Sequence, residues 1–186
     1  CLTLSDGERL IALMLADLHE HLEIDGDLDA GFVKNAICND HLWSIPFKYS
    51  GLDFENGDLP EEVSEVLNIM EMWRFIEFHY SQLSDAHKNE VARLASPFGD
   101  NPQFMGFDGN NEIEHLGIAQ CLIVDLGRFN EFQRRDLNSH TPSLDSYRRM
   151  LPVFDTVRSA SLYDDSVGVE EIVSILIERV HPSYRS

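Results

Sequence analysis

The stretch Val63-Ser-Glu-Val-Leu-Asn-Ile-Met-Glu-Met-Trp-Arg-Phe-Ile-Glu-Phe-His-Tyr80 decides the fold. Its apolar side chains recur at the spacing of a helix. The main apolar face comprises Val63, Val66, Leu67, Met70, Trp73, Ile76 and Tyr80, and Ile69, Met72, Phe75 and Phe78 lie elsewhere around the helix. A helix that is apolar on all sides belongs at the centre of a domain or at a subunit interface. We expect this central helix to open at Asp58-Leu-Pro-Glu-Glu and to reach about Leu83.

Capping signals predict further helices on both sides of the central one. Ser5 and Glu8 form a capping box before a helix to about Glu23, whose apolar side is Leu10, Leu13, Met14, Ala16, Leu18 and Leu22. The other expected helices start at Asp29, at Ser84, at Asp108 (through about Phe132, with Ile113, Leu116, Cys121, Ile123 and Val124 inward), at Thr141-Pro142 (kinked at Pro152) and at Val169 (to His181). Alternation typical of strands is nearly absent. The predicted fold is therefore all-α: a multihelical single domain over residues 1–186, with room for two helical subdomains.

The segment from His41 to Gly57 is the least regular part of the chain. Within it, Trp43-Ser-Ile-Pro-Phe-Lys-Tyr49 has the composition of a short extended segment. Pro46 would restrict this segment to an edge strand or a loop, because proline has no backbone N–H to donate.

The charge balance is strongly acidic, with a formal net charge of −19 from 33 acidic and 14 basic side chains. Such a chain attracts neither nucleic acid nor an anionic membrane surface, since both need clustered Lys and Arg. A basic protein partner is compatible with this charge. A solvated acidic surface is the more common explanation for such a charge balance.

The cysteines and the hydropathy pattern favour a reduced, cytoplasmic protein. The three cysteines, Cys1, Cys38 and Cys121, are far apart and form no C-x-x-C pair. Cys38 and Cys121 lie in apolar surroundings, and we expect both to be buried and inert. No apolar run reaches the ~18 residues that a membrane helix needs. A chain beginning with Cys1 could be a mature lipoprotein, but the early helix start leaves no flexible tether, so a truncated or partly ordered N-terminus is the favoured interpretation.

Four segments carry a resemblance to a known family: Ile69-Met-Glu-Met-Trp73, Gly106-Phe-Asp108 with the helix that follows, Gly127-Arg128, and Thr141-Pro142 through Leu151. Together they resemble the YfbU-like family of bacterial proteins, which has no assigned biochemical activity. The resemblance covers roughly half of the chain and implies a mostly helical cytoplasmic protein that self-associates. It transfers no catalytic residues, and it says least about the segment from Trp43 to Gly57.

Basic residues gather in one region of this acidic chain. Arg128, Arg134, Arg148 and Arg149 fall within a short stretch and are the candidates for an anion site, because guanidinium groups bind carboxylate or phosphate bidentately. The alternative is that these arginines neutralise the many nearby Asp and Glu side chains.

A second pattern, Arg135-Asp-Leu-Asn-Ser-His140, resembles the Arg-x4-His motif of HEPN-type ribonucleases. In that chemistry the His moves the proton of the attacking ribose hydroxyl and the Arg stabilises the phosphate charge. Arg74 and His79 have the same spacing within the central helix, and Pro142 follows the second motif directly, which favours a loop there. Ribonuclease activity of Arg135 and His140 is therefore the alternative hypothesis.

The remaining polar clusters predict no cofactor and no metal site. In Asp17-Leu-His-Glu-His-Leu-Glu23, the pairs at four-residue spacing point in different directions, so a solvated polar face explains them. Glu71 and Arg74 have the spacing of a structural ion pair. The favoured function is that of a non-enzymatic regulatory or interaction protein acting as a homo-oligomer.

Overall fold

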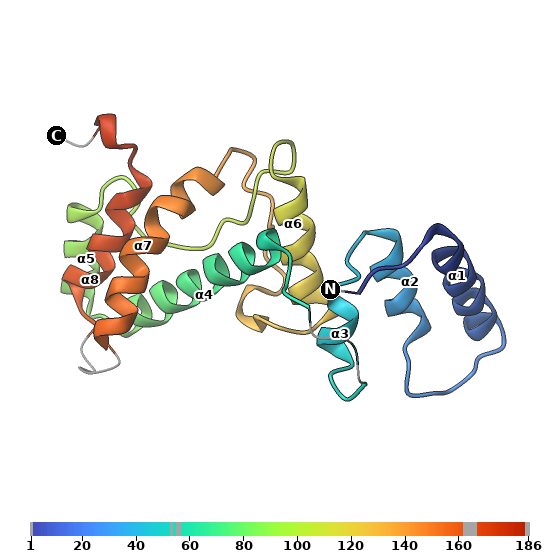
Figure 1. The fold of residues 1–186 in the computed structure, drawn as a ribbon. Helices are drawn as coiled ribbons and strands as arrows, with labels where there is room; N and C mark the ends of the chain where they lie inside the picture. Colours follow the sequence, from blue (N-terminus) through green and yellow to red (C-terminus); the bar gives the residue numbers. More distant parts are fainter. Residues whose placement is uncertain (1, 53, 55–56, 162–166, 185–186) are drawn as a thin grey trace.

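The computed structural model describes residues 2–52, 54, 57–161 and 167–184, and within these ranges all regular elements are helical (Figure 1). The longer helices are α1 (Asp6–His21), α2 (Ala30–Cys38), α3 (Ser44–Lys48), α4 (Glu61–Gln82), α5 (Asp85–Leu94), α6 (Ile113–Gln120), α7 (Leu144–Ser161) and α8 (Val169–Leu176). Short turns of other helix types follow as η1 (Cys121–Asp125), η2 (Asn130–Phe132), η3 (Ile177–Arg179) and η4 (Pro182–Tyr184). Strand pairing in the described residues is limited to one isolated bridge between Phe107 and Asn138. The all-α prediction is confirmed.

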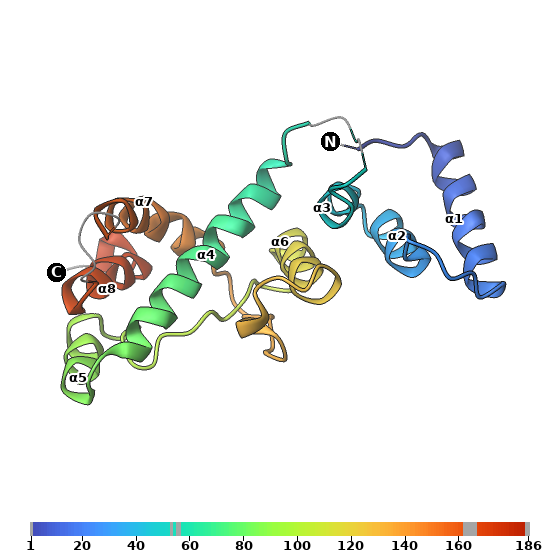
Figure 2. The same cartoon turned by 90° about the horizontal axis from the view of Figure 1, so that it is seen from below.

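The main core surrounds α4, as the apolar pattern of this helix predicts. Figure 2 shows α4 crossing the molecule, with α7 and α8 on one side and α6 on the other. Trp73 is fully buried and contacts the rings of Phe104 and Tyr147 at centroid distances of 6.4 and 5.7 Å. Full burial of a single Val, Ile or Met side chain contributes about 1.5–3 kcal/mol. The buried side chains of α4 are Val63, Val66, Ile69, Met70, Met72, Trp73 and Ile76.

The C-terminal helix completes this core from within the same chain. Ile172, Ile175 and Leu176 of α8 are fully buried, and α8 contacts α5, α7 and α4. The apolar stripe of α8 and the buried side chains of α4 are therefore covered within the chain and are not available to a second copy.

The N-terminal helices α1 and α2, which we call the arm, form a separate layer at one end of the molecule (Figures 1 and 2). A second hydrophobic cluster joins α2 to α3 and consists of Phe32, Ala36, Ile37, Leu42 and Ile45. Among the described residues, α1 packs Ala12 and Leu13 against this cluster, and Ala16 is its buried residue. The capping box of Ser5 and Glu8 is confirmed, with the Ser5 N–H 2.8 Å from the Glu8 carboxylate. The cap of α2 by Asp29 is also confirmed.

The extended segment expected at Trp43–Tyr49 is wrong, because residues 44–48 form α3. Pro46 lies in the first turn of this helix, where a backbone N–H has no partner within the helix in any case. The proline therefore does not oppose a helix here. Burial of Trp43, Ser44 and Ile45 then stabilises a turn that local signals did not predict.

The long helix expected from Asp108 to Phe132 is also wrong, because α6 begins only at Ile113. The Asp108 carboxylate instead accepts hydrogen bonds from Asn110 and Asn111 and so holds a turn before the helix. After η1 the chain leaves the helical path at Gly127, whose φ is +61°. Ile113 and Val124, expected to be inward, are 66% and 70% exposed.

Two smaller differences concern the C-terminal helices. Helix α7 begins at Leu144, three residues after the expected cap at Thr141, and includes Pro152 on its way to Ser161. The last α-helix ends at Leu176 and passes into the 3-10 turn η3, short of the expected end at His181.

A buried carboxylate holds α7 against the segment that precedes α6. Glu112 is 7% exposed, and its Oε1 accepts from the backbone N–H groups of Ser143 and Leu144 at 2.8 and 2.7 Å. Its Oε2 accepts from the Asp108 N–H at 2.8 Å and from the Ser143 hydroxyl at 2.9 Å. One side chain thereby satisfies donors at the start of α7 and in the turn held by Asp108.

We expect Glu112→Ala to lower the free energy of unfolding by about 3 kcal/mol, since it leaves several buried donors without an acceptor. The matched control is Glu114→Ala, whose side chain is exposed two residues further along α6 and should change stability by less than about 0.5 kcal/mol. Urea unfolding followed by circular dichroism measures both. Equal effects in the two variants would contradict a structural role for the Glu112 contacts.

Candidate functional site

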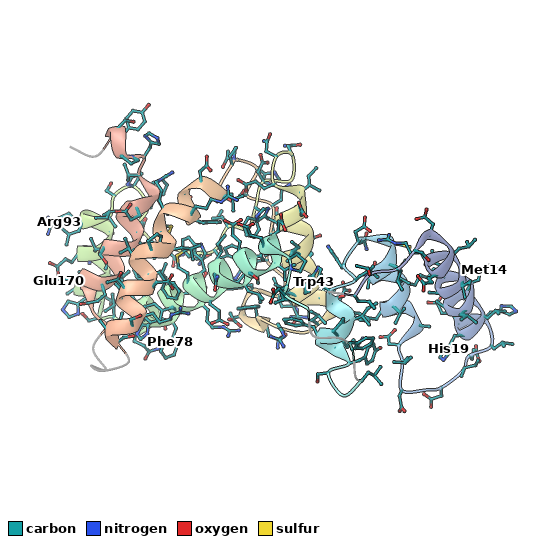
Figure 3. All side chains as sticks on the ribbon, in the orientation of Figure 1. Met14, His19, Trp43, Phe78, Arg93 and Glu170 are labelled. Atoms are coloured by element: carbon teal, nitrogen blue, oxygen red, sulfur yellow. The ribbon has the colours of Figure 1, made fainter. Side chains whose placement is uncertain are left out.

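An open cleft of about 1050 Å³ lies between the arm and the body of the molecule. One wall comes from the end of α2 and the residues up to Trp43, which Figure 3 labels at the inner end of α3. The facing walls come from the start of α4, from α6 with η1, and from residues 134–137.

Charged groups around this cleft are mostly acidic. The lining contains the carboxylates of Asp40, Glu62, Glu114, Asp125 and Asp136 and the guanidinium groups of Arg134 and Arg135. Apolar side chains share the lining, and they include the exposed Ile113 and Val124. The cleft therefore combines apolar contact area with a rim of carboxylates.

His41 is the titratable base inside the cleft. Its ring lies 5.9 Å from that of Trp43 and faces Gly117, where any side chain would approach the Nε2 atom to 3.5 Å. Burial lowers the pKa of His41 below its ordinary value, and this effect outweighs the attraction of Asp125, Asp40 and Glu114. His41 is accordingly neutral at pH 7.

Cys121 also lines the cleft, but its chemistry is that of a buried thiol. Burial and the neighbouring Asp125 carboxylate raise the pKa of Cys121 to about 12. A thiol with this pKa supplies almost no thiolate at neutral pH, so Cys121 is a poor nucleophile. Within the described ranges, no group of three His, Cys, Asp or Glu side chains could hold a metal ion.

The two residues of the nuclease hypothesis lie in a loop and have separate partners. The Arg135 guanidinium binds both carboxylate oxygens of Glu77, at 2.7 and 2.8 Å. His140 is exposed, with its Nε2 3.4 Å from Asp136, and its φ of +56° is left-handed, not helical. Arg74, which has the same spacing to His79 as Arg135 has to His140, also has partners: it pairs with Glu71 and Glu131.

The four arginines of the expected anion site have different surroundings. Arg148 binds both oxygens of Glu65, at 2.6 and 2.9 Å, and this contact lowers the pKa of Glu65. Arg149 donates to the carbonyls of residues 145, 178 and 179. Arg128 lies over the Phe47 ring at 4.6 Å. Of the four, only Arg134 lines the cleft, and it has no hydrogen-bond or ion-pair partner among the residues that the structure describes.

Some buried polar residues had no signal in the sequence. The Nε2 atom of His115 lies 2.8 Å from the Glu65 carboxylate, which also binds Arg148. Glu65 of α4 thereby contacts both α6 and α7. Arg179 lies over the rings of Phe98 and Trp73, at 4.3 and 5.4 Å, and burial lowers its pKa. These residues are separated in sequence from their partners, so periodicity could not identify them.

The geometry defines a class of protein: an all-helical scaffold with an open, acidic and partly apolar cleft. The chain belongs to the YfbU domain family, whose model matches residues 43–177. The match confirms the resemblance carried by the sequence. The matched residues include most of the cleft. The arm lies before them, and so does the wall of the cleft that α2 contributes. No helix in the described part of the chain is both long enough and apolar enough to cross a membrane.

The expectation that Cys38 is buried is wrong, because this thiol is exposed at the end of α2. The apolar neighbours of Cys38 in sequence face the second cluster, whereas Cys38 itself lies on the opposite side of the helix. Cys1 lies outside the described residues. Cys121 is buried, as expected.

We expect a thiol reagent at pH 7.5 to label Cys38 at least about 100-fold faster than Cys121, since burial and a raised pKa both suppress the thiolate of Cys121. Peptide mass spectrometry after timed labelling distinguishes the two sites. In Cys38→Ser protein, labelling of residue 121 should remain slow until denaturant is added. Rapid labelling of Cys121 in native buffer would show that the cleft opens further than described.

For the nuclease hypothesis, we expect purified protein to cleave RNA no faster than a buffer control in the presence of a metal chelator. The Arg135 guanidinium is occupied by Glu77, and the acidic chain repels phosphate. A labelled RNA oligonucleotide resolved on a gel measures this for the wild type and for His140→Ala. Metal-independent cleavage that disappears in His140→Ala would make the enzyme the leading hypothesis.

Proposed function

We propose that this YfbU-family chain is a non-enzymatic interaction protein that works as a homo-oligomer, with the apolar face of α1 as the contact between copies. One observation supports this proposal. Five large apolar side chains on the 16-residue helix α1, and the Leu22 side chain at its C-cap, are each 54–63% exposed; the five on the helix are Leu10, Ile11, Met14, Leu15 and Leu18. A contiguous apolar surface of this kind usually marks an interaction site.

The spacing of these residues favours a second copy of the same helix. Ile11, Leu15, Leu18 and Leu22 are separated by four, three and four positions. This is the spacing of the seam in a two-helix coiled coil. A pair of identical helices related by a two-fold axis covers the same residues on both partners, so neither seam is left exposed.

The charge of the chain determines which kind of contact can succeed. Two copies that each carry a net charge of −19 repel each other at long range. The α1 seam itself is uncharged, and its burial would have to overcome this repulsion. Added salt screens the repulsion, so self-association through α1 should become stronger as ionic strength rises.

We expect light scattering at micromolar concentration to give a mass above that of the 21.2 kDa monomer, and a larger one in high salt than in low salt. Leu15→Glu with Leu18→Glu should restore the monomer, because two carboxylates in the seam are costly to bury. The matched control is Phe78→Glu with Leu94→Glu, which alters two exposed apolar residues on α4 and α5.

Three outcomes would contradict this proposal. The wild type could be a monomer at all salt concentrations, which would remove the homo-oligomer altogether. The α1 variant could keep the oligomeric mass, or the control could lose it, and either result would move the contact away from the arm. Circular dichroism of each variant verifies that the helices remain folded.

A further inference from the structure

We propose that the cleft between the arm and the body binds a basic, amphipathic helical segment of a partner protein. This interaction does not depend on self-association through α1. The two surfaces differ in place and chemistry, since the α1 face is apolar and uncharged whereas the cleft has an acidic rim.

The apolar part of the cleft supplies contact area for such a segment. Ile113 on α6 and Val124 near the end of η1 are exposed. They do not belong to the buried side of these two elements. The side chains of Val63, Ile118 and Leu137 continue this surface inward. A helix is about 10–12 Å wide with its side chains, so a volume of about 1050 Å³ accommodates roughly two turns.

The carboxylates of the cleft are available to cations from outside. Glu62 and Glu114 carry no ion pair or side-chain hydrogen bond with any residue in the described ranges. Asp125 accepts only from neutral groups, including the Asn35 amide at 3.1 Å. Glu62 comes from α4, and Glu114 and Asp125 come from α6 and the η1 turn that continues it, so two walls of the cleft carry these acids. Lys and Arg side chains flanking an apolar stripe would match this arrangement.

Charge also argues against other occupants. A second copy of this chain would offer α1 as its exposed amphipathic helix, and that helix carries Asp6, Glu8, Asp17 and Glu20. Like charges would oppose its entry into an acidic cleft. Nucleic acid is disfavoured for the same reason, because phosphate and carboxylate repel each other. Arg135 is paired with Glu77, and Arg134 alone does not reverse the sign of the rim.

The test uses the full chain and a fluorescein-labelled helical peptide of about fourteen Leu and Lys residues, with all leucines on one face. Fluorescence anisotropy should show saturable binding that weakens as salt increases. The same peptide with Glu in place of every Lys should bind at least about tenfold more weakly.

Cleft variants then locate the binding surface. Glu62→Gln, Glu114→Gln and Asp125→Asn together should weaken binding of the Lys peptide about tenfold. The matched control, Glu90→Gln, Asp100→Asn and Glu170→Gln, changes the net charge equally but lies away from the cleft, as Figure 3 shows for Glu170. It should change affinity by less than about twofold. Ile113→Ser with Val124→Ser should also weaken binding, and this loss should persist in high salt.

Each remaining outcome overturns the proposal. Equal losses in the cleft triple and the control triple would mean that the peptide binds the acidic surface in general. Binding that disappears in the Leu15→Glu, Leu18→Glu variant but not in the cleft variants would place the peptide on the arm. Equal binding of spermine and the Lys peptide, with no effect of Ile113→Ser and Val124→Ser, would reduce the cleft to a site for simple cations.

Discussion

The apolar character of α4 on all sides is the constraint on which the rest of the structure depends. A helix with seven fully or nearly fully buried side chains needs cover around its whole circumference, and no single neighbour can provide it. Helices α7 and α8 supply one side, α6 supplies another, and the aromatic segment from Phe104 to Phe107 fills the space between them. The polar residues of α4 then fix these neighbours in place. Glu65 binds Arg148 of α7, and Glu77 binds Arg135 of the loop before it.

These ion pairs also explain why the arginines of this region have different surroundings. An arginine that is paired bidentately with a carboxylate has already used the geometry with which it would bind phosphate. Arg135 and Arg148 are in this state, and Arg149 donates to backbone carbonyls. These three arginines therefore interact with other groups of the same chain. What remains at the surface is an excess of carboxylates, and the cleft beside the arm is where that excess meets exposed apolar side chains.

Much of the helical framework could be predicted from sequence because the signals are local. The caps at Ser5, Asp29 and Ser84 involve a side chain and a backbone N–H three residues away, so they can be read directly from the chain. Most of the buried positions of α4 followed from periodicity, but Ile69 and Met72, which were expected away from its main apolar face, are also fully buried. Two predictions were wrong because the residue type fitted a local rule but its position in the structure did not. Asp108 is a residue type that caps helices, but its carboxylate binds Asn110 and Asn111 in the turn before α6. Pro46 looked unfavourable for a helix, although it lies in the first turn of one.

The sequence by itself determined the helical class, the central position of α4, the acidic surface and the family, because composition, periodicity and motif order are properties of the chain alone. Only the tertiary structure decided which apolar faces stay exposed. The pattern of α1 is as amphipathic as that of a buried helix, yet its apolar face stays exposed in the described part of the chain, whereas the stripe of α8 is covered by α5 and α7. The same holds for the cleft, whose walls combine residues from the end of α2 to the loop before α7. Their approach follows from the packing of distant segments around α4, and no local pattern encodes it.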